Sequence, residues 1–499
     1  MTESIPRASA PGVEVPRRAW QALIVLLLGM FMALLDTTIV NVALPTIETS
    51  LDASEATLSW IISGYALAFG LALIPSGKVG DRVGHKWVFF AGLALFTVAS
   101  FACGLAQNDL QLVIARIVQG LAGGIFVPAV TAFIQLLFPG QVRGKAFAIM
   151  GAVIGVSTAL GPIAGGLIIE AFGNENGWRG VFWVNLPIGV VGLIAAAFLL
   201  PNRSEIESET RSETGIDWVG LLLVTAGLVA LLVPLIEGQD QGWPVWTYIT
   251  LAAGALLIAA FGAWEVHYTK RGHNPLVPPK LFAHPAFTGG TILALVYFAS
   301  FTSIFFTLSL LWQSGLGNSA LSSGAVMLPF AIGSIIASSQ SNKLTQRLGR
   351  TVLLLGTSLV AVSLIWMWIL LATTDASELT NWKLLVPLLI GGLGNGAFIA
   401  PNAQFIVATV DRQDAGAASG VISTMQRIGS AVGIAVIGSV LFGSLNITGP
   451  DTVASGFMHA ASVAMAVSAA FGVVALLLVF ALPKRVDAPG PPSRESVDH

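Results

Sequence analysis

Three charged side chains lie inside long apolar stretches of this chain: Asp36 in 19–42, Arg116 in 110–132 and Arg427 in 416–442. Charge is costly in such stretches, so a functional role is the default hypothesis for each residue. Burial favours the neutral form of a carboxyl, whereas a neighbouring guanidinium favours the ionised form, so an Asp–Arg pair can take up and release a proton near neutral pH. These residue types predict proton coupling at Asp36, Arg116 and Arg427.

Asp36 and Arg116 are expected at matching depth in a membrane. Asp36 stands ~24 Å along its helix, and Arg116 lies ~21 Å from the same face of a ~30 Å hydrocarbon core. Arg427 lies ~16 Å deep and can face a cavity or be held structurally by backbone carbonyls. The alternative for Asp36 is a structural role, with Arg116 as its ion-pair partner or with hydrogen bonds to nearby polar side chains, namely Thr37, Thr38 and Asn41.

The stretches that hold these charges are typical of membrane-spanning helices. The chain is 55% hydrophobic and 10% charged, against about 25% charged in soluble domains, and its mean hydropathy is +0.81. Strand-like alternation is lacking, which favours an all-α bundle over a membrane β-barrel. We predict fourteen spans: 19–42, 57–77, 87–106, 110–132, 146–170, 181–200, 217–236, 247–264, 287–312, 320–341, 351–373, 384–408, 416–442 and 459–482.

Basic residues predict the orientation of these spans in a cell membrane. With both termini cytoplasmic, the Lys and Arg residues outside the spans face the cytoplasm except Arg179 and Lys383, as the positive-inside rule requires. The weakest pair of spans is 217–236 and 247–264, and twelve spans would satisfy the charge pattern equally. We keep the pair because its loss would leave a cytoplasmic loop, 201–286, with apolar segments that need a soluble core.

An internal repeat divides the chain into two halves. The segment Gly77–Lys86 joins spans 2 and 3, and Asn342–Thr351 joins spans 10 and 11 with Lys, Arg and Gly at the same offsets. Parallel repeats of this kind build transporters whose substrate site lies between the halves. The predicted organisation is an N-terminal tail (1–18), a six-helix bundle (19–200), a linker with two inserted helices (201–286), a second six-helix bundle (287–482) and a C-terminal tail (483–499).

Four motifs make the chain resemble the major facilitator superfamily, and within it the fourteen-span drug:proton antiporters. They are the Asp36 string in span 1, the loop after span 2, Arg116-Ile117-Val118-Gln119-Gly120 in span 4, and Gly161-Pro162-Ile163-Ala164-Gly165-Gly166 in span 5. The resemblance implies a cytoplasmic gate at Gly77, Asp81, Arg82, Gly84 and Arg347, and an antiporter motif at Gly161, Pro162, Gly165 and Gly166. Gln346 stands where the first loop has Asp81, so any charge cluster at the gate should be asymmetric.

The resulting functional hypothesis is proton-driven efflux of amphipathic or cationic organic compounds by alternating access. The candidates for a substrate pocket are polar and aromatic residues of the spans, namely Asn41, Trp60, Tyr65, Phe126, Phe301, Gln313 and Gln426. An exporter of one physiological compound (a lipid, an amino acid or a self-made antibiotic) is the alternative. A membrane enzyme or receptor is disfavoured because nucleotide-binding and nucleophile motifs are missing. A channel is disfavoured because a two-half repeat with a single charged midplane site suits alternating access better than an open pore.

Cofactors and macromolecular partners are not expected. The single cysteine, Cys103, excludes an intramolecular disulfide, and the six histidines show no spacing suited to a metal. The expected partners are a small-molecule substrate, protons and the lipid bilayer, with no nucleic acid. We expect a monomer driven by the proton gradient.

Overall fold

The structure is a computed structural model that describes residues 15–53, 55–173, 176–202, 217–238, 241–408, 410–411 and 414–482. The described residues form helices and no strands. The first half contains α1 (Arg17–Leu51), α2 (Glu55–Val83), α3 (His85–Leu105), α4 (Asp109–Leu137), α5 (Gly140–Phe172), α6 (Gly177–Trp183) and α7 (Asn185–Leu199). The second contains α10 (Pro285–Leu310), η3 (Leu311–Gly315), α11 (Ala320–Val326), α12 (Leu328–Leu348), α13 (Thr351–Thr373), α14 (Asn381–Val407), α15 (Ala415–Ser444) and α16 (Val453–Ala481).

Thirteen helices of the described chain are long and apolar enough to cross a membrane, and a bent pair in α2 makes fourteen. The bend of 44° separates Trp60–Leu73 from Pro75–Val83. Pro75 lacks the N–H that would continue the helical ladder, which explains a bend at this point. The prediction of a fourteen-span all-α bundle is therefore confirmed.

The doubtful pair of spans is present as α8 (Trp218–Glu237) and α9 (Val245–Lys270). These two helices pack on each other, and α8 also contacts α2 of the first half and α15 of the second. Leu232 of α8 lies against Gly70 of α2. The indole N–H of Trp243, which follows α8, donates to Ser439 of α15 at 2.6 Å. The insert is thus attached across the junction of the two halves.

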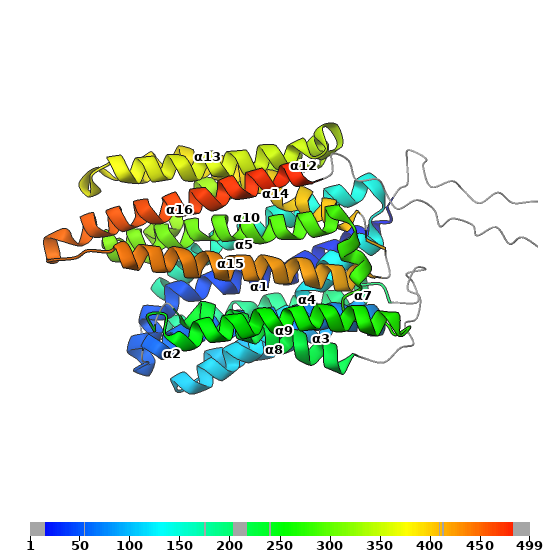
Figure 1. Ribbon diagram of the computed structural model, residues 1–499. Coiled ribbons are helices and arrows are strands. Elements are labelled where there is room, and N and C mark those ends of the chain that lie inside the picture. Colours follow the sequence, from blue (N-terminus) through cyan, green and yellow to red (C-terminus); the bar gives the residue numbers. More distant parts are fainter. Residues whose placement is uncertain are drawn as a thin grey trace, which may run out of the picture.

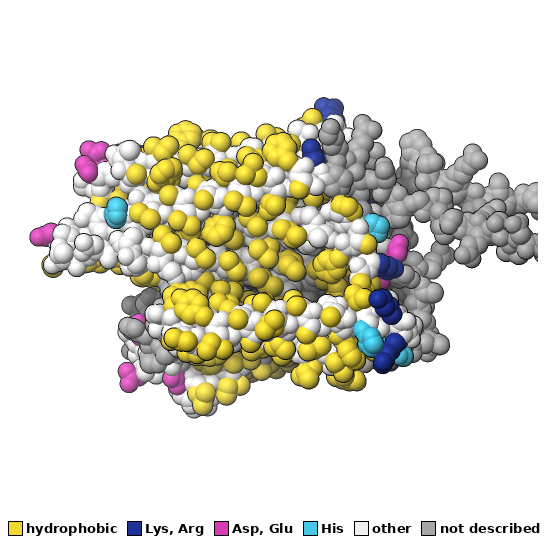
Figure 2. Space-filling view, viewed as in Figure 1, with side chains coloured by type: hydrophobic (Ala, Val, Ile, Leu, Met, Phe, Trp, Pro, Cys, Tyr) yellow, Lys and Arg dark blue, Asp and Glu magenta, His cyan; other side chains and the backbone are white. Residues whose placement is uncertain are grey.

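The helices run roughly side by side, and we call the end at which α1 begins and α16 ends the tail end (Figure 1). Figure 2 shows the visible Lys and Arg side chains gathered at this end, where the charge pattern predicts the cytoplasm. The orientation itself stays a prediction. Parts of the predicted tails (1–14 and 483–499), the acidic linker residues 205–209 and the basic residues Arg203, Arg211 and Arg412 lie outside the described residues.

The two halves share a hydrophobic core near the tail end. Phe133 and Phe147 of the first half belong to the same buried cluster as Ile406 and Val421 of the second. Two further clusters lie mainly within single halves, one around Trp178 and Phe182 of the first half and one along the second half that includes Met465. The structure is therefore closed at the tail end.

Candidate functional site

Asp36 and Arg116 form an ion pair in the interior of the first half. Nη1 of Arg116 lies 2.6 Å from Oδ2 of Asp36, and the two side chains are 2% and 0% exposed. The matching depth predicted for α1 and α4 therefore holds. A pair so deeply buried must satisfy its remaining hydrogen-bonding groups, because breaking it would leave an uncompensated charge.

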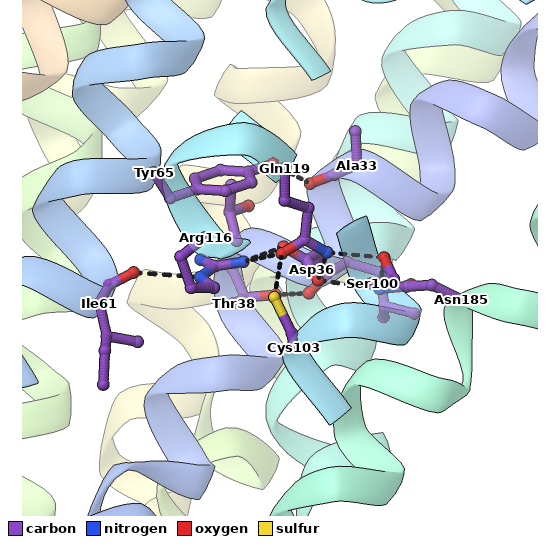
Figure 3. Close-up of polar contacts among 12 residues, drawn as sticks. Ala33, Asp36, Thr38, Ile61, Tyr65, Ser100, Cys103, Arg116, Gln119 and Asn185 are labelled. Atoms are coloured by element: carbon purple, nitrogen blue, oxygen red, sulfur yellow. Dashed lines mark hydrogen bonds and ion pairs between the residues drawn. The ribbon is translucent and has the colours of Figure 1, made fainter. Parts of the chain in front are cut away.

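Polar side chains from three further positions complete the site (Figure 3). Gln119 and Asn185 each donate a hydrogen bond of 2.9 Å to Oδ1 of Asp36. Ser100 accepts from Gln119 at 2.7 Å and from Asn185 at 3.3 Å. Asp36 thus sits in a cage of neutral hydrogen-bond donors beside the Arg116 guanidinium.

Arg116 is held in place by the hydrogen bonds that its planar guanidinium donates. Nε donates to the carbonyl of Ile61 at 3.0 Å, and Nη1 donates to Gln119 at 2.7 Å as well as to Asp36. The guanidinium carbon lies 4.1 Å from the ring centre of Tyr65, whose hydroxyl donates to the Ala33 carbonyl at 3.3 Å. Such a fork with a stacked face is specific to arginine.

The Arg427 side chain stacks on Phe69 of α2. Its guanidinium carbon is 4.1 Å from the ring centre of Phe69, one helical turn from Tyr65. The two arginines, one from each half, therefore stack on consecutive aromatic residues of a single helix. Within the described chain no carboxylate contacts Arg427, so its role in proton coupling remains a prediction.

Glycines in α4 bring that helix against the backbone of α2. A Cβ on Gly120 would lie 2.2 Å from the carbonyl oxygen of Tyr65, and one on Gly124 would lie 2.2 Å from that of Phe69. No side chain fits at either position. The close approach places Arg116, on the same helix, under the Tyr65 ring.

The other candidates for a substrate pocket are not gathered in one place. Phe126 is buried in the first half against Phe89 and Phe96, at ring distances of 5.6 and 5.8 Å. Asn41 is exposed. The remaining candidates are Trp60 and Gln426, which are half-buried, and Gln313 of η3, whose amide donates to Ser309 at the end of α10 at 2.9 Å.

Phe301 alone among these candidates lines a small recess between the halves, in the part of the chain that the structure describes. Phe305 and Phe330 of the second half share this recess with Gly155 of α5. The rings of Phe301 and Phe330 are stacked at 5.9 Å. Asn395 supplies a polar group, which accepts from the Tyr297 hydroxyl at 2.8 Å.

The predicted gate residues meet the second half at the tail end. Asp81 accepts from the backbone N–H groups of Gly416 (3.0 Å) and Ala417 (3.1 Å), in the first turn of α15, and contacts His85 Nε2 at 3.2 Å. An anion is favoured there by the helix dipole and the free N–H groups. A Cβ on Gly77 would lie 2.2 Å from the Gly416 carbonyl oxygen, so the two helices touch through their backbones.

The second copy of the repeat has the same turn but a different contact. Gly84 and Gly349 stand at the same offset, and both have positive φ (104° and 55°), which glycine adopts without strain. Gln346 donates to Asn342 of its own helix at 3.3 Å instead of capping a helix of the other half. The expected asymmetry is therefore present. Arg82 and Arg347 are exposed.

The predicted antiporter motif in α5 faces two neighbours. A Cβ on Gly161 would lie 1.9 Å from Thr38 Oγ1 of α1, and one on Gly165 would lie 3.1 Å from Ile39. A Cβ on Gly324 of α11 would lie 2.7 Å from the Pro162 side chain. Gly166 faces Leu321, also in α11. This segment therefore joins α1 to the second half, away from the tail end.

Sequence reasoning missed three members of the site. Gln119 stands one turn after Arg116 on α4, and that spacing puts both on one helix face. Asn185 begins α7 after a break in span 6, and Pro187 explains the break because it has no N–H for the preceding turn. Ser100 carries no comparable signal. Thr37 and Thr38 bond to backbone carbonyls of their own helix and leave Asp36 to these partners.

The family model described as Major Facilitator Superfamily matches residues 26–434 and 292–498. The chain belongs to the major facilitator superfamily. Among its relatives in the superfamily is a probable actinorhodin transporter of Streptomyces coelicolor, 35% identical over 91% of this chain and 78% of the relative. The tetracenomycin C resistance and export protein of Streptomyces glaucescens is 32% identical over 89% of this chain and 80% of the relative.

A puromycin resistance protein of Streptomyces alboniger is 32% identical over 96% of this chain and 93% of the relative. Among solved structures, a major facilitator superfamily proton:xylose symporter matches with a TM-score of 0.65 and 14% identity, over 94% of this chain and 96% of the symporter. At this identity the likeness to the symporter shows the fold alone. The prediction of a major facilitator fold is confirmed.

Proposed function

We propose that this protein is a proton-driven antiporter that exports antibiotic-like aromatic compounds and takes up protons at Asp36. The observation that carries the proposal is the buried Asp36–Arg116 pair inside its cage of neutral donors. A carboxylate held at 0% exposure can change charge only when the surrounding groups rearrange. Proton transfer is thereby tied to conformational change, as antiport requires.

The recess and the relatives support this substrate class. Phe301, Phe305 and Phe330 line the recess with aromatic side chains, which favour contact with aromatic compounds. Three relatives are described by names that refer to actinorhodin, tetracenomycin C and puromycin. Asp36 is already paired and Arg427 contacts no described carboxylate, so we propose neutral or anionic compounds over the cationic ones that the sequence hypothesis included.

Breadth of specificity divides this proposal into two versions. The relatives named above support an exporter of one self-made antibiotic as well as a multidrug exporter. Export of several chemically unrelated aromatic compounds would favour the multidrug version. Export of one compound only would favour the other.

The experiment is substrate-driven proton flux in proteoliposomes with the purified monomeric protein. A gradient of an anionic aromatic dye should drive counter-movement of protons, recorded by a trapped pH indicator. A proton gradient should in turn drive the dye uphill. Dye movement that ignores the proton gradient would remove proton coupling from the proposal, and no movement of any aromatic compound would remove export.

A further inference from the structure

Two carboxylates are buried at the tail end of the inserted helices, outside the site described above. Asp217 precedes α8 and Glu265 lies in α9, with exposed fractions of 3% and 2%. Asp217 accepts from the Gly220 N–H at 2.8 Å and from the Trp264 indole at 2.9 and 3.0 Å. Glu265 accepts from the Val277 N–H at 3.2 Å through Oε2. Oε1 of Glu265 is buried with no hydrogen-bond partner among the described residues.

The unpartnered oxygen of Glu265 faces Asp217 across Gly220. A Cβ on Gly220 would lie 2.5 Å from Oδ2 of Asp217 and 2.7 Å from Oε1 of Glu265, so both oxygens converge on one small volume. Two ionised carboxylates cannot share such a buried space at low cost. One proton between them removes the repulsion and supplies the missing donor, as in other carboxyl pairs.

The charged groups around this pair do not neutralise it. Lys78 of α2 is the cation that faces Glu265, but its Nζ donates to Asn274 at 3.5 Å. Farther along, Asp81 of α2, Asp414 before α15 and Lys280 of the 3-10 helix η2 (Pro279–Ala283) surround Lys78. Arg271 and His273, which follow α9, are exposed. Within the described chain no three potential metal ligands are grouped, which favours a proton over a metal ion.

The segment 272–284, which follows α9, connects the carboxyl pair to the tail-end closure. Near its start, Asn274 binds Lys78, the neighbour of Gly77 in α2. Near its end, Lys280 contacts Asp411 at 3.1 Å and Asp414 at 2.7 Å, beside the start of α15. Burial acts to lower the pKa of Lys280, but its hydrogen bonds to Asp414 and Asp411 raise it overall. The segment thus touches both helices that meet at Gly77 and Gly416.

We propose that Asp217 and Glu265 bind one proton between them, and that this proton keeps segment 272–284 seated on the closed tail end. Loss of the proton places two negative charges across Gly220. Glu265 then moves toward water, and the Val277 N–H that it holds moves with it. The insert therefore makes the closure sensitive to pH at a second site, separate from Asp36. The proposal rests on the closure and not on the identity of the substrate.

The test measures opening of the tail end directly. The variant carries Asp36→Asn, which removes titration at the coupling site, together with Cys103→Ser and Ser338→Cys. Ser338 is 0% exposed, and its Oγ lies 3.2 Å from the Cβ position of Gly151 across the two halves. Maleimide labelling, divided at each pH by the rate for the same cysteine in the unfolded protein, should accelerate as pH rises from acidic to alkaline. The division removes the ordinary increase of thiolate with pH. Adding Glu265→Gln, which is permanently neutral, should abolish this acceleration and keep labelling slow.

A matched control is Glu237→Gln, the same change at the other end of the insert, which should leave the acceleration intact. The midpoint of thermal unfolding gives a second readout. A proton bound only in the folded state stabilises it at low pH and is lost as pH rises, so Glu265→Gln should flatten the alkaline fall of the midpoint. The proposal is overturned if Glu265→Gln labels or unfolds with the pH dependence of its background, or if Glu237→Gln has the same effect.

Discussion

A hydrogen bond joins Asp81 in the first half to Gly416 in the second half, and it requires glycine at position 416. The Gly416 N–H donates to Oδ1 of Asp81 at 3.0 Å, and a Cβ on Gly416 would lie 2.5 Å from that same oxygen. The hydrogen bond across the halves is therefore possible because residue 416 has no side chain. This contact exists in the closed state, so changing it shifts the balance between closed and open states.

Asp81→Asn should open the tail end. The amide removes the charge that the α15 N-terminus stabilises, a loss of about 1–2 kcal/mol, or roughly five- to thirtyfold in the closed-to-open ratio. Maleimide labelling of Ser338→Cys, in a Cys103→Ser background, should speed up accordingly. Gln346→Ala, at the corresponding position of the repeat, breaks a contact within one helix and should change labelling little. Unchanged labelling with reduced export would assign Asp81 to folding and not to closure.

Gly416→Ala should open the tail end more than Asp81→Asn does. The added Cβ would lie 2.3 Å from the Gly77 carbonyl oxygen as well as against Asp81, and backbone cannot move aside as a flexible side chain can. The control is Gly443→Ala in the same helix, where nothing lies within 4 Å of the new atom. If both alanines leave Ser338→Cys equally protected, the backbone contact does not hold the halves together.

Asp36→Asn should abolish uphill export and lower stability. Arg116 would remain buried with no ionised partner, which costs about 3–5 kcal/mol. Asp36→Asn/Arg116→Gln removes both charges and should recover much of the thermal stability without recovering proton-coupled export. Thermal unfolding and dye-driven proton flux are measured on the same preparations. Uphill export by either variant would show that Asp36 does not carry the proton.

Arg116→Lys should fail although it keeps the charge. A lysine ammonium cannot reproduce the Nε contact to Ile61 together with the Nη1 contacts to Asp36 and Gln119. We expect at least a tenfold loss of export, measured as initial rate in proteoliposomes. Arg17→Lys, an exposed position at the start of α1, is the matched control. Near-normal export by Arg116→Lys would mean that a point charge suffices.

Gly161→Ala should damage the protein far more than Gly166→Ala. The first Cβ would lie 1.9 Å from Thr38 Oγ1 and push α5 away from α1 next to Asp36, whereas the second would lie 3.4 Å from Leu321, an ordinary contact. Export rate and thermal midpoint should both fall for Gly161→Ala. Equal behaviour of the two variants would contradict the packing described for this motif.

Apolar length and charge were sufficient to predict a bundle of membrane-spanning helices, because stretches this long leave few architectures open. Its division into two halves was predicted from the repeat of Gly77–Lys86 in Asn342–Thr351 and from the motif resemblance. The pairing of Asp36 with Arg116 was also predictable, since depth along a helix follows from residue number. Asn185 was not placed in this way although it lies within the span Gly177–Leu199, because depth does not tell which helix face points toward Asp36. Which pocket candidates line the recess could not be predicted for a related reason: type and depth do not tell which face of a helix Phe126 or Phe301 occupies.

The lone thiol of this protein is a natural reporter of its own site. Cys103 is 0% exposed and its Sγ lies 3.6 Å from Oε1 of Gln119, the residue that bridges Arg116 and Asp36. Because the chain has one cysteine, the unmodified protein already carries a single chemical probe at that point. Gln119 also donates to Asp36, so a rearrangement of this hydrogen-bond cage changes the surroundings of the sulfur. Alkylation of the native protein therefore reports opening of the structure beside Gln119 without any engineered label.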